Sequence, residues 1–577
     1  MSESERIVIR PEHPPRRTLA ELAAHCGGVI RQDDTARPPD SDEPSRLDAV
    51  PTVRPDPGID TADAVTVSGL DLSSHTVRPG ELYVALPGHR VHGADFVEQA
   101  RAAGAVAVLT DGEGATRAAG SGLPCVVVPD PRAILGGVAA WMYGTDLARP
   151  QLLAVTGTNG KTSVVHLLDA LLRQLGVRSG LSSTATRRVA GEVMASSLTT
   201  PEASELHALL ARGQELDVGA VAVEVSAQAL SRHRVDGLTF DVAGFTNLSH
   251  DHLDDYDSMD TYYRAKVELF RRSRRAVILV DTPWGAHLAN ELALPCTTIT
   301  TATTATTLAD SENAGMTPLG APIIGITTAG TPTAAVPVVQ PAADWNLVLE
   351  EEAATHTRIR LTHRDGRTLC TRVPLFGGYM AANAALAIVM VLEAGYSFDA
   401  LATALARDGG IDAYIPGRTE LISGATGPRV YVDYAHTPDA FAQTLAALRV
   451  FTPGRVVMLF GADGDRDTTK RADMAAIAAR GADVVVVTDF HPRFEDAAAI
   501  RRTLMTAARA AVPEREMYEI ADPREALRAV IALAGEADTV LYAGPGHEDY
   551  HEVAGTKQPY SARDEARIAL REAGWLE

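Results

Sequence analysis

A glycine-rich segment, TGTNGKTS at residues 156–163, carries the clearest chemical signal in the chain. It lies between the apolar run 151–157 and a helical pattern that begins at Lys161. Glycines let backbone N–H groups turn toward phosphate oxygens, and the N-terminus of a helix adds positive potential. A lysine at this position reaches the terminal phosphates of a nucleotide, and the threonine after it can ligate Mg²⁺. We therefore predict a phosphate-binding loop made of Gly157, Thr158, Asn159, Gly160, Lys161, Thr162 and Ser163.

The elements on either side must hold this loop in place. The run after the loop brings several apolar side chains onto one helical face, namely Val164, Leu168, Leu171, Leu172 and Leu175. Strand-like runs at 221–226, 240–249 and 276–281 alternate with helical stretches, which predicts a mainly parallel sheet covered on both faces. The loop departs from the strict P-loop pattern, whose first glycine would stand at Val155. A plain glycine-rich turn between strand and helix is the alternative interpretation.

Length, composition and charge exclude several classes of protein. At ~100 to 200 residues per domain, 577 residues predict about three domains. The chain has 53 Lys plus Arg against 74 Asp plus Glu, a formal charge of −21, which argues against nonspecific binding to nucleic acid or to anionic membranes. No apolar run approaches the ~18 residues that would span a bilayer. The start of the chain lacks an apolar signal region, and its four cysteines are too far apart for CxxC pairs, so we expect a reducing cytoplasm.

Composition and periodicity predict an α/β protein with three domains. Residues 1–64 are expected to contain a short helix within 18–30 and a proline-rich flexible extension. A small α/β domain follows at 65–148, a central domain at 149–414 and a doubly wound domain at 415–577. Within the central domain, 297–341 begins with a threonine-rich run and is interpreted as a variable insertion.

The motifs that follow the phosphate loop resemble one enzyme family. In chain order they are TTP (199–201), EVSAQAL (224–230), FTNLSHDHLDDY (245–256), YYRAK (262–266), PGR (416–418), DYAHTPDA (433–440), GADGDRDTTKR (461–471) and GPGHEDY (544–550). With GTNGKT, this set resembles the Mur ligases, and among them the enzymes that add a third residue, meso-diaminopimelate or lysine, to UDP-N-acetylmuramoyl-L-alanyl-D-glutamate. The resemblance implies an N-terminal domain for the UDP substrate, a central P-loop ATPase-type domain and a C-terminal Rossmann-like ligase domain.

The resemblance also implies ATP, Mg²⁺ and a carbamylated lysine. Such a ligase turns a carboxylate into an acyl phosphate that an amine then attacks, so cations must offset the negative charge of carboxylate and γ-phosphate. Glu224 and His252, each at or beyond the end of a strand, have ligand atoms suited to Mg²⁺ beside Thr162. Lys266 stands where family members carry the CO₂ adduct, and a surface lysine in a salt bridge is the alternative. The expected catalytic residues are Lys161, Glu224, His252 and Lys266, of which the last three and Thr162 form the expected metal site.

In the third domain, the family pattern assigns further residues to closure over the nucleotide: Arg418, Asp433, His436 and the segment 464–467. Asn383 corresponds to an asparagine near adenine, and the family's second asparagine is Met380 here. A merely well-capped loop would also contain an aspartate at the end of a strand and an arginine near a glycine turn.

Choice of the incoming amino acid depends, in the family, on the motifs DNPR and GxGHE. Here they read FHPR (490–493) and GPGHE (544–548). Arg493 can bind a distal carboxylate bidentately and Glu548 can pair with an ammonium group, so meso-diaminopimelate is the favoured amine. The changed residues of FHPR would also suit an amine with an apolar side chain. The expected amino-acid site is Arg418, Phe490, His491, Pro492, Arg493, Gly546 and Glu548.

The residues expected to bind the nucleotide-sugar donor depart from the family pattern in part. Its LDSR motif reads LSSH at 72–75, and its EVSSH motif reads EVSAQ at 224–228. The expected donor site is Leu72, Ser74, Thr199, Thr200, Ser226, Arg232 and Arg234. Loss of an aspartate and an arginine from the LDSR turn is compatible with retuned UDP binding or with a different acyl donor.

The resulting hypothesis is a monomeric, cytoplasmic, ATP-dependent amide ligase that acts on small molecules and neither binds nucleic acid nor inserts into membranes. Two alternatives stay open. One is a paralogue that joins a different carboxylate and amine in specialised metabolism, and the other is a nucleotide-binding subunit without turnover. Intact Lys161, Glu224, His252 and Lys266 argue against the second.

Overall fold

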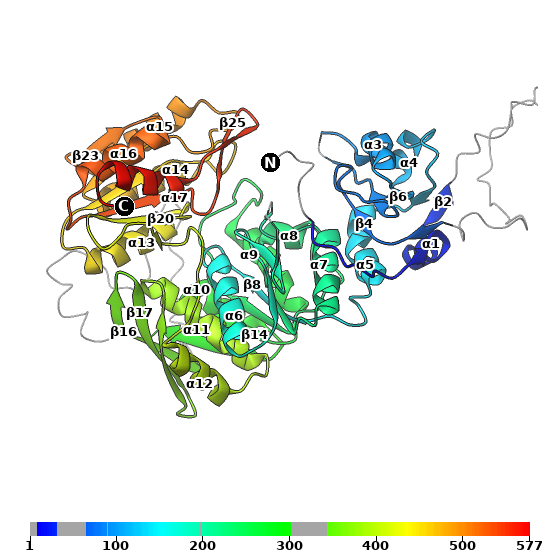
Figure 1. The fold of residues 1–577 in the computed structure, drawn as a ribbon, viewed down its shortest axis with the longest axis horizontal. Helices are drawn as coiled ribbons and strands as arrows, with labels where there is room; N and C mark the ends of the chain where they lie inside the picture. Colours follow the sequence, from blue (N-terminus) through cyan, green and yellow to red (C-terminus); the bar gives the residue numbers. More distant parts are fainter. Residues whose placement is uncertain are drawn as a thin grey trace, which may run out of the picture. The chain divides into compact units, whose positions relative to one another are not determined.

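The computed structural model describes residues 8–31, 65–88, 90–194, 196, 198–301 and 343–576. The chain forms two compact units, which Figure 1 colours by sequence; the smaller comprises Met1–Gln151, Thr186–Val221 and Ala229–Thr239. The larger comprises Leu152–Ala185, Ala222–Gln228 and Phe240–Glu577. The predicted flexible extension lies outside the described residues. None of the helices in the described ranges is long and apolar enough to cross a bilayer.

The smaller unit contains a five-stranded sheet in the order β2 (Val29–Arg31), β7 (Cys125–Val127), β6 (Ala107–Thr110), β5 (Leu82–Val84) and β4 (Leu70–Asp71). Strands β4 to β7 are parallel and β2 is antiparallel. Its helices are α1 (Leu19–Cys26), α3 (Val97–Ala102), α4 (Gly112–Arg117) and α5 (Pro131–Tyr143). The predicted short helix is α1, which begins with a capping box between Thr18 and Glu21.

Helix α7 (Ala203–Glu215) packs on this N-terminal part, although its sequence lies within the range expected for the central domain. Leu135 and Met142 of α5 share a buried core with Ala203, Ala208 and Ala211 of α7. Small alanine side chains let two helices approach closely, which explains the pairing. A hairpin of β10 (Arg187–Val189) and β11 (Glu192–Met194) belongs to the same unit.

The phosphate loop is carried by the central sheet of the larger unit. The strands of this sheet that lie wholly or mainly in the larger unit run in the order β9 (Ser179–Ser182), β12 (Ala220–Glu224), β8 (Gln151–Thr156), β13 (Val242–Phe245), β14 (Ala276–Leu279), β15 (Cys296–Thr301), β16 (Trp345–Ala353), β17 (His356–His363) and β18 (Thr368–Val373). Pairs from β8 through β16 are parallel, as predicted, and β16 to β18 are antiparallel. Residues 297–301, expected to start an insertion, instead pair within β15, and the rest of that segment lies outside the described residues.

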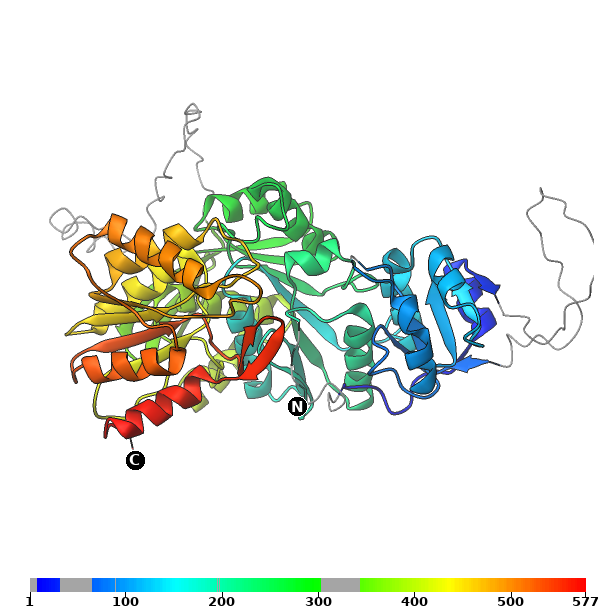
Figure 2. The same ribbon diagram turned by 90° about the horizontal axis from the view of Figure 1, so that it is seen from above.

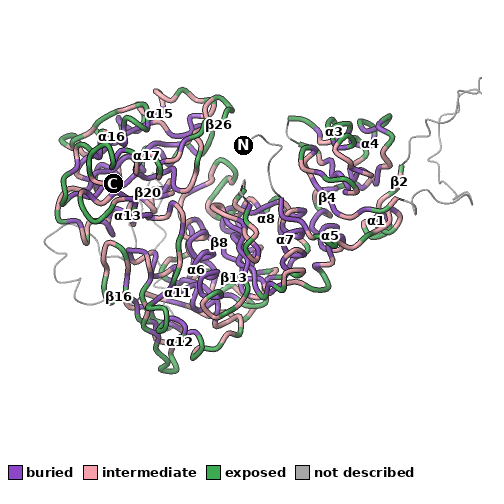
Figure 3. Tube along the Cα trace, in the orientation of Figure 1, coloured by how far each residue is buried: buried purple, intermediate pink, exposed green. Residues whose placement is uncertain are grey.

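Two long helices pack together over this sheet, α6 (Lys161–Gln174) and α11 (Gly378–Glu393). Helix α6 is buried along almost its whole length, as the tube in Figure 3 shows. The remaining helices of this part are α9 (Met259–Arg271), α10 (Pro283–Glu291) and α12 (Phe398–Asp408), and the residues of α8 (Ala227–Ser231) are divided between the two units. Burial of α6 on several sides fixes the position of the loop that precedes it.

The C-terminal part has the predicted doubly wound form. Its sheet runs β19 (Glu420–Leu421), β20 (Arg429–Asp433), β24 (Thr539–Ala543), β21 (Val456–Phe460), β22 (Val484–Val487) and β23 (Glu516–Glu519), parallel except for β19. One face packs on α13 (Pro438–Phe451), α14 (Arg471–Gly481) and α15 (Ala497–Ala511), and the other on α16 (Pro523–Leu533) and α17 (Ala562–Glu572). Figure 2 shows both helical layers. A final hairpin is made of β25 (Tyr550–Val553) and β26 (Thr556–Pro559).

Candidate active site

The phosphate loop turns sharply between β8 and α6, and both of its glycines are required by their surroundings. Gly157 and Gly160 have φ angles of +150° and +88°. A Cβ atom at Gly157 would lie 1.9 Å from Thr246 Oγ1, and one at Gly160 would lie 2.5 Å from Asn383 Oδ1. The loop is therefore fixed by Thr246, which follows β13, and by Asn383 of α11.

Two lysines meet at the start of this loop. Lys161 Nζ donates to the carbonyl oxygens of Gly157 at 3.1 Å and of Thr158 at 2.9 Å. Lys266 Nζ, from α9, donates to the same Gly157 oxygen at 2.7 Å and lies 4.2 Å from the centroid of the Tyr262 ring. Lys266 is 1% exposed. Burial, together with the charge of Lys161, holds the pKa of Lys266 well below its ordinary value.

A carboxylate and a guanidinium flank the threonine of the loop. Glu224, at the end of β12, accepts a hydrogen bond from Thr162 Oγ1 at 3.0 Å and another from the Thr184 N–H at 2.9 Å. Arg418 Nη2 donates to the same Thr162 oxygen at 3.0 Å. Arg418 also lies 4.3 Å from the centroid of the Tyr434 ring. The PGR segment of the C-terminal part thus reaches the phosphate loop of the central part within the larger unit.

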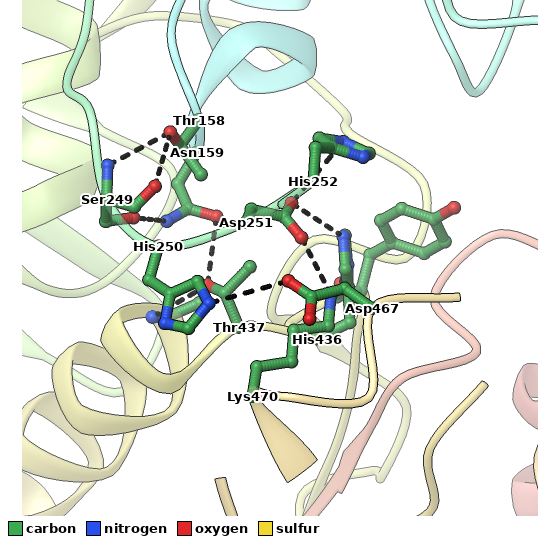
Figure 4. A network of polar contacts seen from close by, with 12 residues as sticks. Thr158, Asn159, Ser249, His250, Asp251, His252, His436, Thr437, Asp467 and Lys470 are labelled. Carbon is green, nitrogen blue, oxygen red and sulfur yellow. Dashed lines mark hydrogen bonds and ion pairs between the residues drawn. The ribbon is translucent and has the colours of Figure 1, made fainter. Parts of the chain in front are cut away.

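A buried ion pair connects the same two parts (Figure 4). Lys470 Nζ lies 2.8 Å from Asp251 Oδ1, and both side chains are largely buried. His252 Nε2 lies 3.5 Å and His436 Nε2 3.9 Å from Asp251 Oδ2. Burial raises the pKa of Asp251, but His252, Lys470 and His436 outweigh it and hold the pKa well below its ordinary value. Asp251 is therefore a carboxylate that the Lys470 ammonium group holds in place.

His252 has an unusual backbone conformation and a lowered side-chain pKa. Its φ angle is +57°, in the left-handed region that few non-glycine residues adopt. Burial is the main cause that lowers its pKa to about 4; Lys266 and Lys161 act in the same direction, and Asp251 opposes them. The imidazole is neutral at pH 7, the form that can ligate a metal ion.

The other predicted nucleotide residues occupy supporting positions. Thr437 Oγ1 donates to Asn159 Oδ1 at 3.3 Å, which brings the DYAHTPDA segment to the loop. Asp433 accepts from the backbone N–H groups of Thr419 at 2.6 Å and Ala435 at 2.8 Å, so it fixes the turn after β20. His436 Nδ1 lies 2.7 Å from the Tyr434 carbonyl oxygen.

The predicted donor-site residues are spread over both units. In the smaller unit, Ser74 Oγ donates to Gln99 Oε1 at 2.9 Å, and Arg234 Nε donates to Glu202 Oε1 at 2.9 Å. The others of that unit are Leu72, which follows β4, Thr199 and Thr200, which precede α7, and Arg232, which follows α8. Ser226 precedes α8 in the larger unit. Their roles stay predictions.

The predicted amino-acid residues lie together in the C-terminal part. Phe490 and His491 have ring centroids 4.2 Å apart, and His491 Nε2 lies 2.7 Å from Glu548 Oε2. A Cβ atom at Gly546 would lie 2.6 Å from Tyr434 Cβ, so glycine is needed there. Arg493 follows Pro492 and is held by backbone contacts to β25.

Sequence reasoning missed Asp251 and Lys470, and one signal could have identified the lysine. Only four of the 53 basic residues of the chain are lysines, at positions 161, 266, 470 and 557. Three of these four lysines lie at this site, in a chain whose other basic residues are almost all arginines. Lysine differs from arginine because it is a compact point charge whose amine can lose its proton. Its presence at these three positions therefore indicates a role in the reaction.

A phosphate-loop domain whose Thr162 is hydrogen-bonded to Arg418 of a doubly wound domain is the arrangement expected of an ATP-dependent ligase. Family models agree: residues 66–141 match "Mur ligase family, catalytic domain", 155–391 "Mur ligase middle domain" and 417–546 "Mur ligase, glutamate ligase domain". The chain belongs to the Mur ligase family, as the sequence motifs predicted.

Individual relatives match over nearly the whole chain. A UDP-N-acetylmuramyl-tripeptide synthetase of Leifsonia xyli subsp. xyli is 55% identical and covers 98% of each chain. A UDP-N-acetylmuramoyl-L-alanyl-D-glutamate--2,6-diaminopimelate ligase of Streptomyces avermitilis is 38% identical and covers 98% of this chain and 97% of its own. A solved structure of a ligase with that second name has a TM-score of 0.57 at 24% identity and covers 97% of this chain and 100% of its own, which shows the shared fold.

Proposed function

We propose that this protein is an ATP-dependent ligase that joins an amino acid to UDP-N-acetylmuramoyl-L-alanyl-D-glutamate. A carboxylate oxygen of the donor attacks the γ-phosphorus of ATP and ADP leaves, which gives an acyl phosphate. The amine then attacks the acyl carbon, phosphate leaves with that carboxylate oxygen, and the amine loses a proton. The observation that carries the proposal is the meeting of Lys161, Lys266, Glu224 and Arg418 at one phosphate loop.

The chain's own charges suit the first step. Lys161 Nζ stands at the loop and Arg418 Nη2 stands at Thr162 Oγ1, so two cations face the place where the terminal phosphates would lie. Preorganised cations stabilise the negative charge that develops as the γ-phosphoryl group is transferred. The Asp251–Lys470 ion pair holds the C-terminal part against this loop, which positions the amine side of the reaction.

The residues present fit a magnesium ion. Thr162, Glu224, His252 and a carbamylated Lys266 would hold it; bound there, Mg²⁺ would offset charge on the ATP phosphates. Carboxylate, hydroxyl and neutral imidazole are suitable donors, and Glu224 already contacts Thr162 at 3.0 Å. The lowered pKa of Lys266 favours the neutral amine, whose nitrogen can form a bond to CO₂ and release a proton.

Each of the three predicted domains has a role in this proposal. We assign UDP-substrate binding to residues 65–148, ATP binding to 149–414 and amino-acid binding with closure to 415–577. The ordinary partners are then small molecules. A monomeric state, a cytoplasmic location and the absence of nucleic-acid binding stay predictions.

The experiment is a set of omission assays with purified protein, ATP and Mg²⁺. ADP release that requires both UDP-N-acetylmuramoyl-L-alanyl-D-glutamate and an amino acid supports the proposal. ADP release with a different carboxylate and none with this donor would support the paralogue instead. The close relative, 55% identical over almost the entire chain, favours the first result.

A further inference from the structure

The arginine expected to bind a distal carboxylate already faces two carboxylates of its own chain. Arg493 Nη1 lies 3.0 Å from Asp463 Oδ1, and Arg493 Nε lies 3.3 Å from Glu552 Oε2. The same Nη1 donates to the Gly464 carbonyl oxygen at 2.6 Å. All three side chains are mostly buried, so solvent screens their charges less than at the surface.

Backbone pairing fixes this arrangement. The Arg493 N–H donates to the Glu552 carbonyl oxygen at 3.2 Å, and the Ala554 N–H donates to the Arg493 carbonyl oxygen at 2.7 Å. These two bonds set the register between the FHPR segment and β25, so Glu552 is held beside the guanidinium. Arg493 itself has a φ angle of +50°, a conformation that the surrounding contacts must maintain.

The neighbouring His491 forms a hydrogen bond with Glu548. His491 Nδ1 accepts from the Glu552 N–H at 2.9 Å, so its Nε2 carries the hydrogen that Glu548 Oε2 accepts at 2.7 Å. The imidazole thus donates to the Glu548 carboxylate through Nε2. Tyr434 also donates to Glu548, at 3.3 Å.

Charge and hydrogen bonding around Arg493 therefore favour a cation. Two carboxylates, those of Asp463 and Glu552, face one guanidinium, and a third, that of Glu548, accepts from His491. Asp463 Oδ1 is buried and has no hydrogen-bond partner among the described residues, because Arg493 donates elsewhere. An ammonium group would satisfy that oxygen, whereas a further carboxylate would meet like charge.

We infer that Asp463 and Glu552 are specificity-determining residues: they neutralise Arg493 and select an amino acid with a cationic side chain and no second carboxylate. The inference rests on the proposed function. The substrate class is then lysine and its shorter homologues, in place of meso-diaminopimelate.

The test compares amines in the ADP-release assay with UDP-N-acetylmuramoyl-L-alanyl-D-glutamate. L-Lysine, L-ornithine and L-2,4-diaminobutyrate differ in side-chain length alone, meso-diaminopimelate adds the distal carboxylate, and L-norleucine supplies an apolar side chain. We expect kcat/KM for one of the three cationic amines to exceed that for diaminopimelate and for norleucine by about tenfold or more.

Two variants remove a negative charge while keeping the shape of the side chain, Glu552→Gln and Asp463→Asn. Each should raise kcat/KM for diaminopimelate relative to the preferred amine by about tenfold. Glu519→Gln is the matched control, since Glu519 pairs with Arg501 at 2.9 Å in the same domain. Its ratio should stay at the wild-type value. Circular dichroism identifies a variant that fails to fold. The amine preference of the other, folded variant then tests the inference.

Preference of the wild-type enzyme for diaminopimelate or norleucine overturns the inference and leaves the proposed function intact. An unchanged ratio in the folded charge variants, or an equal shift in the control, also overturns it. No turnover with any of the five amines overturns the proposed function and this inference with it.

Discussion

Lys161 and Lys266 donate hydrogen bonds to the same carbonyl oxygen, that of Gly157, at 3.1 and 2.7 Å. Two ammonium groups that converge in a buried place repel each other, and the one that is more deeply enclosed loses its proton more readily. The pKa of Lys266 is lowered accordingly. Conversion of Lys266 into a carbamate would exchange this repulsion for attraction, because an anion would then stand beside Lys161.

We predict that Lys266→Ala is inactive and is partly rescued by acetate or another short carboxylic acid, because the missing group is an oxygen ligand. Lys266→Arg should be equally inactive, since arginine keeps the charge and has no amine that forms a carbamate. Intact-mass measurement under nondenaturing conditions should find one added CO₂ on the wild type and none on either variant. Full wild-type activity without bicarbonate, with unmodified Lys266, would contradict the prediction.

Lys161→Ala should abolish phosphate release while the protein stays folded. Its ammonium group contacts loop carbonyls and contributes to transition-state charge rather than to a packed core. Arg274→Ala, which removes an exposed cation of the same domain, is the control. Turnover of the lysine variant within about tenfold of wild type, only ~1.4 kcal/mol of barrier, would show that the loop is not the catalytic phosphate site.

Much of this site was predictable because its signals are local. The apolar run of β8, the loop glycines and the helical face of α6 are neighbours in sequence, and each has its own physical signature. The same holds for β20, β21, β22 and β24, whose apolar runs mark strands buried on both faces.

The missed features depend on contacts that no local pattern reveals. Asp251 and Lys470 are separated by more than 200 residues and meet only because two domains pack together. Helix α7 joins the N-terminal part through small alanines, which carry no signal for a partner. The role expected for Arg493 ignored Glu552, since side-chain pairing across a strand register cannot be read without the fold.

The Asp251–Lys470 pair should contribute to activity by holding the C-terminal part against the phosphate loop. Removing one partner of a buried ion pair leaves an uncompensated charge at a cost of about 3 to 5 kcal/mol. We expect Lys470→Met and Asp251→Asn each to lower kcat/KM by about a hundredfold or more, and the double variant to be less impaired than the product of the two. Arg502→Met removes one partner of the exposed pair with Asp496 and should have little effect. Fully additive losses would contradict a direct coupling.

Acid should lower the stability of the smaller unit because His207 becomes protonated on unfolding. This side chain is fully buried against Thr145, and burial lowers its pKa from 6.5 to about 4. Between these values the unfolded chain binds a proton that the folded chain does not, so stability falls as pH drops from 6.5 to 4, by about 3 kcal/mol in total.

Hydrogen exchange of α7 amides between pH 6.5 and 4 measures this loss. After correction for intrinsic exchange rates, His207→Gln should flatten the pH dependence of protection, because glutamine keeps polar atoms but does not titrate. His13→Gln, at an exposed position of the same unit, should leave the wild-type dependence. A His207 variant with the wild-type slope would contradict the assignment.

The central claim is that this ligase activates a carboxylate of UDP-N-acetylmuramoyl-L-alanyl-D-glutamate as an acyl phosphate. The most direct test supplies this donor with ¹⁸O in its glutamyl carboxylates, together with ATP, Mg²⁺ and the preferred amine, and analyses the released phosphate by mass. The account predicts one donor ¹⁸O atom in each phosphate released, because that oxygen leaves the acyl carbon when the amine attacks. Amide product accompanied by unlabelled phosphate would contradict it.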